Sequence, residues 1–156
     1  MNHICHYHTP IGTLCMQSDG EAITALYVVK KEESDKEDNE DAVMKNAYQQ
    51  LQEYFQGKRT EFDVPIHLEG TEFQKKVWNA LCTIPYGVTC SYADIAKKIG
   101  NSKACRAVGG ANNKNPVMIF VPCHRVIGAN GAMVGYAPGV AIKEKLLCME
   151  RERSQI

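Results

Sequence analysis

The chain has 156 residues, of which 44% are hydrophobic and 23% charged, with Lys+Arg and Asp+Glu each numbering 18. This length buries a core in one domain or two small ones, and no apolar run approaches the roughly 18 residues of a membrane-spanning helix. Residues 1–69 carry 6 basic and 13 acidic side chains, a balance of −7, and residues 70–156 carry 12 and 5, a balance of +7. We expect a polyanionic partner to bind the second half, because phosphate neutralisation releases counterions.

The cysteines and the N-terminus bear on compartment and metal binding. Seven cysteines at irregular spacings, and a polar N-terminus without the apolar segment of a secretory signal, favour a reducing environment, so we expect a cytoplasmic protein. His3, Cys5, His6 and His8 raise the alternative of a zinc site. Their side chains alternate between two faces of a strand and match no strong zinc pattern, so we expect no metal.

The first half of the chain predicts a small sheet and one helix. Residues 4–29 combine β-branched and aromatic residues with turns that end at Gly12 and Gly20, as in an antiparallel sheet. Residues 30–41 are charged or polar and predict an exposed loop. An amphipathic helix follows from Asp41 and stops at Gly57. Its expected apolar positions are Val43, Ala47, Leu51, Tyr54 and Phe55.

After an extended connector over residues 60–70, the pattern predicts a helix from about Thr71 to Thr83. Thr71 followed by Gln74 is typical of a capped start. The expected apolar face consists of Phe73, Val77, Trp78 and Leu81. Residues 85–87, Pro-Tyr-Gly, end this helix.

The next segment predicts a helix-turn-helix. Ser91 is expected to cap a short helix that runs through Ile99, and Ser102 is expected to cap a second helix that runs to about Ala111. The second helix has little side-chain bulk. Its small residues are Ala104, Ala107, Gly109, Gly110 and Ala111. Such a helix is poorly suited to reading base edges in the major groove but suits close backbone approach; tight internal packing is the alternative.

A possible nucleophile follows the apolar run Val117–Val121. The run predicts a buried strand that ends at Pro122, which fixes φ and removes a backbone donor. Cys123 and His124 come next. A base or positive charge near a cysteine raises its thiolate fraction, and the thiolate is the nucleophile. Taken alone, a cysteine after an apolar run is more often an inert core residue.

The ordered series around this pair is more specific than the pair itself. It includes the motif Pro122-Cys123-His124-Arg125-Val126, together with residues 84–87, 91–92, 106–112, 115–121 and 142–144. This series closely resembles the O6-alkylguanine-DNA alkyltransferases, the methylated-DNA–protein-cysteine methyltransferases. The resemblance runs from about Gly70 to Glu150 and continues more loosely upstream.

The resemblance implies an α+β fold in two domains. Residues 1–69 would form a sheet-plus-helix domain similar to ribonuclease H, and residues 70–156 a mainly helical, winged-helix-like domain for DNA binding and alkyl transfer. It also implies a DNA repair protein that moves the alkyl group of O6-alkylguanine, and of O4-alkylthymine, irreversibly to Cys123. Each molecule would act once, as a monomer without a cofactor.

The same resemblance implies a role for each catalytic residue. Cys123 would be the nucleophile, His124 the base that acts through a water molecule, and Glu150 the residue that orients His124. Asn115 would hold the turn that bears the nucleophile. Without the resemblance, Glu150 would be assigned to the polar surface of a terminal helix, because Arg151, Glu152 and Arg153 follow it.

DNA contacts are implied for the second helix of the helix-turn-helix and its neighbours. Double-stranded DNA would bind through its minor groove with the target nucleotide flipped out of the stack. Arg106 would fill the vacated space, with Ala107, Gly109 and Gly110 close to the backbone. Tyr92 would crowd the phosphate and support the departing guanine. The alternatives are a simple phosphate contact for Arg106 and core packing for Tyr92.

The base-binding pocket is implied to include Val126, Tyr136, Ala137 and Pro138. Carbonyl groups of Cys123 and Val126 would face the base and the Ala137 amide its oxygen. Pro138 stands where the family often has a smaller residue, so we expect a stiffer pocket and a narrower range of adducts.

Three other functions remain as alternatives. Alkyltransferase-like proteins bind the same lesions without transfer but carry another residue where Cys123 stands. A Cys-His hydrolase would require an oxyanion hole and repeated turnover. A transcriptional regulator would require a recognition helix with longer side chains.

Overall fold

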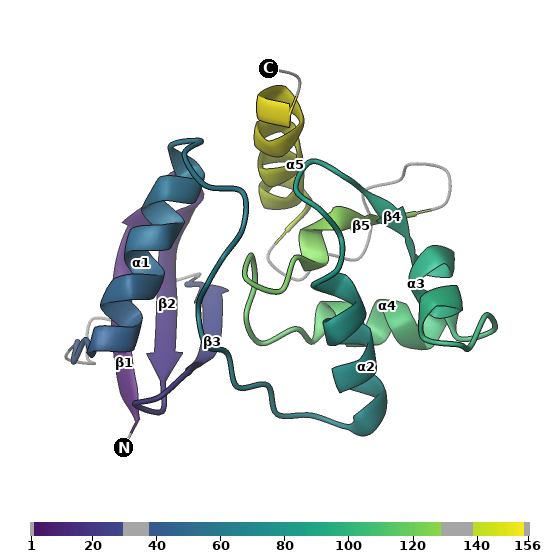
Figure 1. Ribbon diagram of the computed structural model, residues 1–156, viewed down its shortest axis with the longest axis horizontal. Coiled ribbons are helices and arrows are strands. Elements are labelled where there is room, and N and C mark those ends of the chain that lie inside the picture. The colour runs from purple at the N-terminus through teal and green to yellow at the C-terminus, as the bar shows by residue number, and fades with distance from the viewer. Residues whose placement is uncertain (1, 30–37, 129–138, 155–156) are drawn as a thin grey trace. The chain divides into compact units, whose positions relative to one another are not determined.

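A computed structural model of the protein describes residues 2–29, 38–128 and 139–154 (Figure 1). The chain divides into two compact units, Met1–Leu68 and Glu69–Ile156. No helix within the described ranges is both long and apolar enough to cross a membrane. The fold is α+β, with the sheet in the first unit and most of the helices in the second.

The N-terminal unit is a three-stranded antiparallel sheet with one helix against it, as expected. The strands β1 (His3–Thr9), β2 (Gly12–Ser18) and β3 (Ile23–Val28) pair in chain order. Pro10 and Ile11 form the loop of the first hairpin. Gly12 follows them at φ 114°, a conformation that glycine adopts without a Cβ clash.

Helix α1 (Ala42–Phe55) begins at the predicted Asp41. The Asp41 carboxylate accepts a hydrogen bond from the Met44 amide at 2.8 Å and another from the Ser18 hydroxyl at 2.7 Å, so one side chain caps the helix and ties it to β2. Of the expected apolar positions, Ala47, Leu51 and Tyr54 are fully buried and Val43 and Phe55 are partly buried, whereas the fully buried Met44 was not among them. Met44 lies three residues before Ala47 and seven before Leu51, which is the helical spacing.

The C-terminal unit opens with α2 (Glu72–Leu81), capped as predicted. The Thr71 hydroxyl accepts from the Gln74 amide at 3.1 Å, and the Gln74 side chain accepts from the Thr71 amide at 3.0 Å. Trp78 is almost fully buried and donates from Nε1 to the Ala111 carbonyl at 2.9 Å. This bond links α2 to the second helix of the helix-turn-helix.

The helix-turn-helix consists of α3 (Tyr92–Lys98) and α4 (Cys105–Asn113), which pack against each other and against α2 (Figure 1). Ser91 caps α3 as predicted. The prediction that Ser102 caps α4 is wrong. The Ala104 amide donates to the Asn101 carbonyl, so Ser102 lies inside a turn, and α4 begins without a side-chain cap.

Two short strands and a terminal helix complete this unit. β4 (Cys90–Ser91) pairs in parallel with β5 (Val126–Ile127), which places the start of α3 beside the segment that follows Cys123. Helix α5 (Val140–Ser154) packs against the one-turn 3₁₀ helix η1 (Cys123–Arg125). Its buried positions are Lys143, Leu146, Leu147 and Glu150.

Candidate active site

Cys123 lies in a tight loop rather than after a strand. The predicted strand over Val117–Val121 is wrong. In that run the Phe120 amide donates to the Met118 carbonyl and the Val121 amide to the Val117 carbonyl, so the chain folds back on itself. An apolar run reports burial, and here the buried segment is a turn. Cys123 follows as the first residue of η1 and is 3% exposed.

The Asn115 side chain forms hydrogen bonds with the backbone of this loop, which pairs with no neighbouring strand among the described residues. Its Nδ2 donates to the Val121 carbonyl at 2.8 Å, and its Oδ1 accepts from the Val117 amide at 3.0 Å. Between these points Ile119 has φ 71°, which is unfavourable for a β-branched residue. The Asn115 side chain therefore stabilises a strained turn directly before Cys123.

His124 and Glu150 form a buried pair across η1 and α5. His124 Nε2 lies 2.6 Å from Glu150 Oε2, and both residues are 0% exposed. A burial of this degree excludes the assignment of Glu150 to a polar surface. His124 Nδ1 is also buried and has no hydrogen-bond partner among the described residues.

Arg125 binds the same carboxylate. Its Nε donates to Glu150 Oε1 at 2.8 Å and its Nη2 to Oε2 at 3.1 Å, the two-pronged geometry of a strong Arg–carboxylate pair. The Gly87 amide donates to Oε1 at 3.3 Å. The third prong of Arg125, Nη1, donates to the Ile84 carbonyl at 2.8 Å. The sequence placed Arg125 in the motif without a role.

These contacts set the charges of the pair. Burial alone would raise the Glu150 pKa, but its hydrogen bonds with His124 and Arg125, together with the charge of Arg125, lower that pKa from 4.5 to about 2. Burial lowers the pKa of His124 below its usual value. The hydrogen bond and charge of Glu150 would raise this pKa, whereas the charges of Arg125 and Lys143 lower it further. The arrangement is a neutral imidazole that donates from Nε2 to an ionised carboxylate.

Lys143 and Asn112 are two further polar side chains of the site that sequence reasoning missed. Lys143 is fully buried, and the charge of a Cys123 thiolate counteracts the lowering of its pKa by burial. Asn112 Nδ2 donates to the Cys123 carbonyl at 3.3 Å, while Asn112 Oδ1 is buried without a partner among the described residues. For Lys143 a signal existed: it lies seven residues before Glu150, with two leucines between them on the same helical face.

Tyr92 is the first residue of α3 and lies near Cys123. Burial raises the Tyr92 pKa, and the charge of Cys123 raises it further. A Cβ at Gly109 would lie 3.9 Å from the Tyr92 ring, an ordinary contact distance. Tyr92 thus connects the helix-turn-helix with the surroundings of Cys123.

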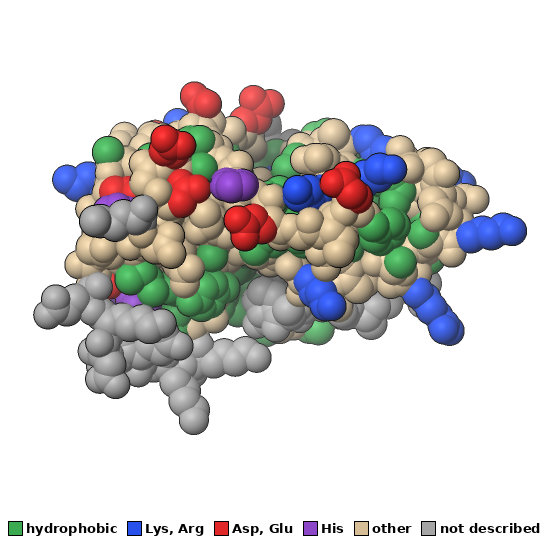
Figure 2. Space-filling model, turned by 90° about the horizontal axis from the view of Figure 1, so that it is seen from below, with side chains coloured by type: hydrophobic (Ala, Val, Ile, Leu, Met, Phe, Trp, Pro, Cys, Tyr) green, Lys and Arg blue, Asp and Glu red, His purple; other side chains and the backbone are tan. Residues whose placement is uncertain are grey.

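The remaining residues expected on α4 share an exposed face. Arg106, Ala107 and Gly110 are exposed. A Cβ at Gly110 would meet nothing within 4 Å, so internal packing does not require glycine there. Figure 2 shows Lys and Arg side chains projecting from the C-terminal unit, and Asp and Glu gathering on the N-terminal unit.

Of the expected pocket residues, only one lies in the described part of the chain. Val126 is fully buried and pairs with Cys90 across the two short strands. Tyr136, Ala137 and Pro138 lie outside the described residues. Among described residues, no three His, Cys, Asp or Glu side chains gather as a metal site requires. His6 and His8 instead contact Asp38 and Thr13, at 2.8 and 3.1 Å.

Comparisons with known proteins match both halves of the chain. The family model "6-O-methylguanine DNA methyltransferase, ribonuclease-like domain" matches residues 4–68, and "6-O-methylguanine DNA methyltransferase, DNA binding domain" matches residues 72–152. A methylated-DNA–protein-cysteine methyltransferase of Methanosarcina acetivorans is 50% identical, covering 92% of this chain and 95% of its own length. A constitutive one of Bacillus subtilis is 46% identical, covering 97% and 96%.

A solved structure agrees with these matches. The crystal structure of Mycobacterium tuberculosis OGT in complex with DNA superposes with a TM-score of 0.89 at 45% identity, over 97% of this chain and 94% of that one. Matched family models span both units, and close relatives cover nearly the full length. The chain belongs to the 6-O-methylguanine DNA methyltransferase family.

Proposed function

We propose that Cys123 is the acceptor through which this protein, a methylated-DNA–protein-cysteine methyltransferase that repairs O6-methylguanine in DNA, removes alkyl groups. The observation that carries the proposal is the position of Cys123: it is nearly buried and directly precedes a fully buried histidine whose imidazole is paired to Glu150. A buried base beside a thiol is the arrangement that generates a thiolate nucleophile.

The reaction begins with loss of the thiol proton. Because Glu150 accepts the Nε2 proton of His124, the lone pair is on Nδ1, which accepts the Cys123 proton through one water molecule. The Cys123 thiolate then attacks the alkyl carbon. The new S–C bond forms as the C–O6 bond breaks, and the electron pair of that bond stays on the guanine oxygen. The Tyr92 hydroxyl supports the departing guanine as it takes up a proton.

The product explains why we propose a single turnover. A thioether has no leaving group that His124 or Glu150 could activate, so the alkyl group remains on Cys123 and the protein is consumed. The same displacement serves O4-alkylthymine, whose alkyl group is also bonded to a base oxygen. No cofactor takes part in the displacement.

The protein binds DNA, as the relative crystallised with DNA does. For this chain we assign the contact to the exposed face of α4, through the minor groove, with the target nucleotide flipped into the pocket that contains Val126. Arg106 fills the vacated position in the stack, and the small residues Ala107, Gly109 and Gly110 let the helix backbone approach the DNA. A flipped base costs a few kcal/mol of lost stacking, which these contacts offset.

We assign different tasks to the two halves of the chain. Residues 70–156 contain the nucleophile, its base and the basic surface, and residues 1–69 form the ribonuclease-like domain. We assign the protein to the cytoplasm as a monomer. Tyr136, Ala137 and Pro138, which lie outside the described residues, are assigned to the base by the family resemblance alone, and in this proposal Pro138 narrows the range of alkyl groups.

A titration of active protein tests the proposal. Fixed amounts of protein are incubated with increasing amounts of a duplex that contains O6-methylguanine, and repaired guanine is counted. We expect the amount of repaired guanine to reach a plateau at one per protein molecule and a second addition of duplex to remain unrepaired. Continued repair beyond one equivalent would contradict the proposal and favour a hydrolase.

A further inference from the structure

The carboxylate of Glu150 is shared between a base and a permanent cation. Four N–H groups donate to it: His124 Nε2, Arg125 Nε and Nη2, and the Gly87 amide. Each carboxylate oxygen accepts two of these bonds. Because Arg125 is charged at every working pH, the carboxylate that orients His124 is already neutralised by an ion pair.

This neutralisation changes what His124 experiences. An isolated buried carboxylate 2.6 Å from an imidazole would stabilise the imidazolium strongly. When Arg125 lies on the same carboxylate, its positive charge opposes a second positive charge on the ring. An imidazole that is already protonated has no lone pair to accept the proton of Cys123.

We propose that Arg125 is a positioning residue of the transfer reaction, which keeps His124 neutral before the reaction and holds the Glu150 carboxylate in the plane that directs Nδ1 toward the proton path. This inference rests on the proposed role of His124 as the base. It assigns a chemical task to a side chain that would otherwise be only a structural ion pair.

Other charged groups also act on His124. From α5, Glu150 favours the imidazolium and the buried Lys143 opposes it. From η1, Arg125 opposes it. A Cys123 thiolate would favour it, and Tyr92 on α3 interacts with that thiolate. Arg125 differs from the rest because it bonds directly to both oxygens of the carboxylate that His124 contacts.

Arg125 also fixes the carboxylate to the main chain. Its Nη1 bond to the Ile84 carbonyl and the Gly87 bond to Glu150 hold both partners on the connection between α2 and β4. The Arg125 guanidinium lies 5.8 Å from the Tyr86 ring centroid of the same connection. The fork therefore has a fixed orientation, which a lysine in its place would not reproduce.

The test is the pH dependence of the single-turnover transfer rate in full-length variants. Arg125→Met keeps an unbranched apolar stem and removes the charged guanidinium, so we expect the acid limb of the profile, where the rate falls as His124 is protonated, to move up by roughly 1 to 2 pH units. Arg125→Lys keeps a charge, so its limb should stay near the wild-type position while the rate falls. The double variant Arg125→Met, Glu150→Gln removes both charges, so its limb should return toward the wild-type position.

The protonation of the His124 ring can also be measured directly in variants that fold but react too slowly for a rate profile. The ¹⁵N shifts of the His124 ring report its protonation without DNA, and we expect imidazolium at higher pH in Arg125→Met than in the wild type. The inference would be overturned if Arg125→Met lowered the rate equally at every pH, and left both the acid limb of the pH–rate profile and the ¹⁵N titration of the His124 ring unchanged. A different result would refute the proposed role of His124 as the base: the variant His124→Asn would then show the same pH dependence of the transfer rate as the wild type.

Discussion

The buried position of Glu150 could not be expected from the residues that follow it in the sequence. Along the chain it is followed by three charged residues, yet its side chain is fully buried against His124 and Arg125. Cys123 and His124 could be singled out from the sequence because they are adjacent in one motif, and their roles stay predictions. The buried ion pair was not predictable, since it joins residues 25 apart, and only the helical spacing from Lys143 gave a hint of it.

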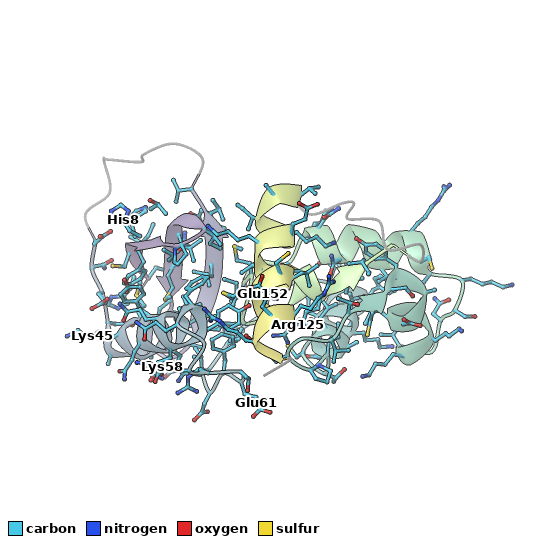
Figure 3. The ribbon with its side chains drawn as sticks, turned by 90° about the horizontal axis from the view of Figure 1, so that it is seen from above. His8, Lys45, Lys58, Glu61, Arg125 and Glu152 are labelled. Atoms are coloured by element: carbon cyan, nitrogen blue, oxygen red, sulfur yellow. The ribbon has the colours of Figure 1, made fainter. Side chains whose placement is uncertain are left out.

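Substitution of Glu150 tests the ion pair. We expect Glu150→Gln to lower the free energy of unfolding by about 3 to 5 kcal/mol, because it leaves the charge of Arg125 buried without compensation. Glu152→Gln, an exposed residue on the same helix (Figure 3), is the matched control and should change stability little. Equal stabilities of the two variants in urea denaturation would show that the pair contributes nothing.

The pH dependence of stability follows from the same residue. The folded-state pKa of Glu150 is lowered from 4.5 to about 2. Its contribution is therefore fully present above pH 4.5 and is lost as the pH falls toward 2. In Glu150→Gln this part of the acid destabilisation should be missing, which denaturation curves between these pH values measure.

Arg106 allows base flipping to be separated from chemistry. If its side chain fills the vacated stack, Arg106→Ala should slow transfer from an O6-methylguanine duplex by at least tenfold, since an unfilled stack leaves the cost of flipping uncompensated. Transfer from a free O6-alkylguanine base needs no flipping and should be unchanged. Lys114→Ala, which removes another exposed charge at the end of α4, is the control for charge alone. Equal losses on both substrates would refute the role.

At the scale of elements, capped helices were predictable and irregular segments were not. Asp41, Thr71 and Ser91 each start a helix as the sequence indicated, because a side-chain acceptor satisfies the first free amides. Helix α4 starts without such a cap. The loop before Cys123 depends on side-chain hydrogen bonds from Asn115, which apolar periodicity does not reveal.

Because α4 has small side chains at its exposed face, we expect two substitutions of Gly110 to have different effects, one on stability and one on DNA binding. Gly110→Ala should raise the free energy of unfolding by about 0.5 to 1 kcal/mol, because alanine favours the helix and its Cβ enters open space. Gly110→Leu should fold as well but bind duplex DNA more weakly, because its side chain would separate the helix from the DNA. Fluorescence anisotropy measures the affinity. Wild-type affinity in Gly110→Leu would remove α4 from the interface.

At the scale of the molecule, the charge separation seen in the sequence coincides with the division into two units. The neutral total conceals it, so net charge alone would have argued against nucleic acid. The fold of each half was predictable from periodicity, turns and resemblance. The base pocket stays a prediction from resemblance, because its expected members Tyr136, Ala137 and Pro138 form no periodic pattern that indicates a contact and lie outside the described residues.

The charge separation predicts which lysines govern the salt dependence of DNA binding. Lys103→Gln, in the basic unit, should reduce the slope of log affinity against log salt by about 0.9 if it contacts one phosphate. Lys45→Gln, exposed in the acidic unit, should leave the slope unchanged. Equal effects of both substitutions would contradict the assignment of DNA to the C-terminal unit.

The central claim is that Cys123 takes the alkyl group and keeps it. Peptide mapping by mass spectrometry, after the full-length protein has reacted with a duplex containing O6-methylguanine, tests this most directly. We expect one methyl group per molecule, on Cys123 alone, and none after the same incubation of Cys123→Ala. A methyl group on any of the other six cysteines, or an unmodified protein that has nevertheless repaired the duplex, would contradict the account.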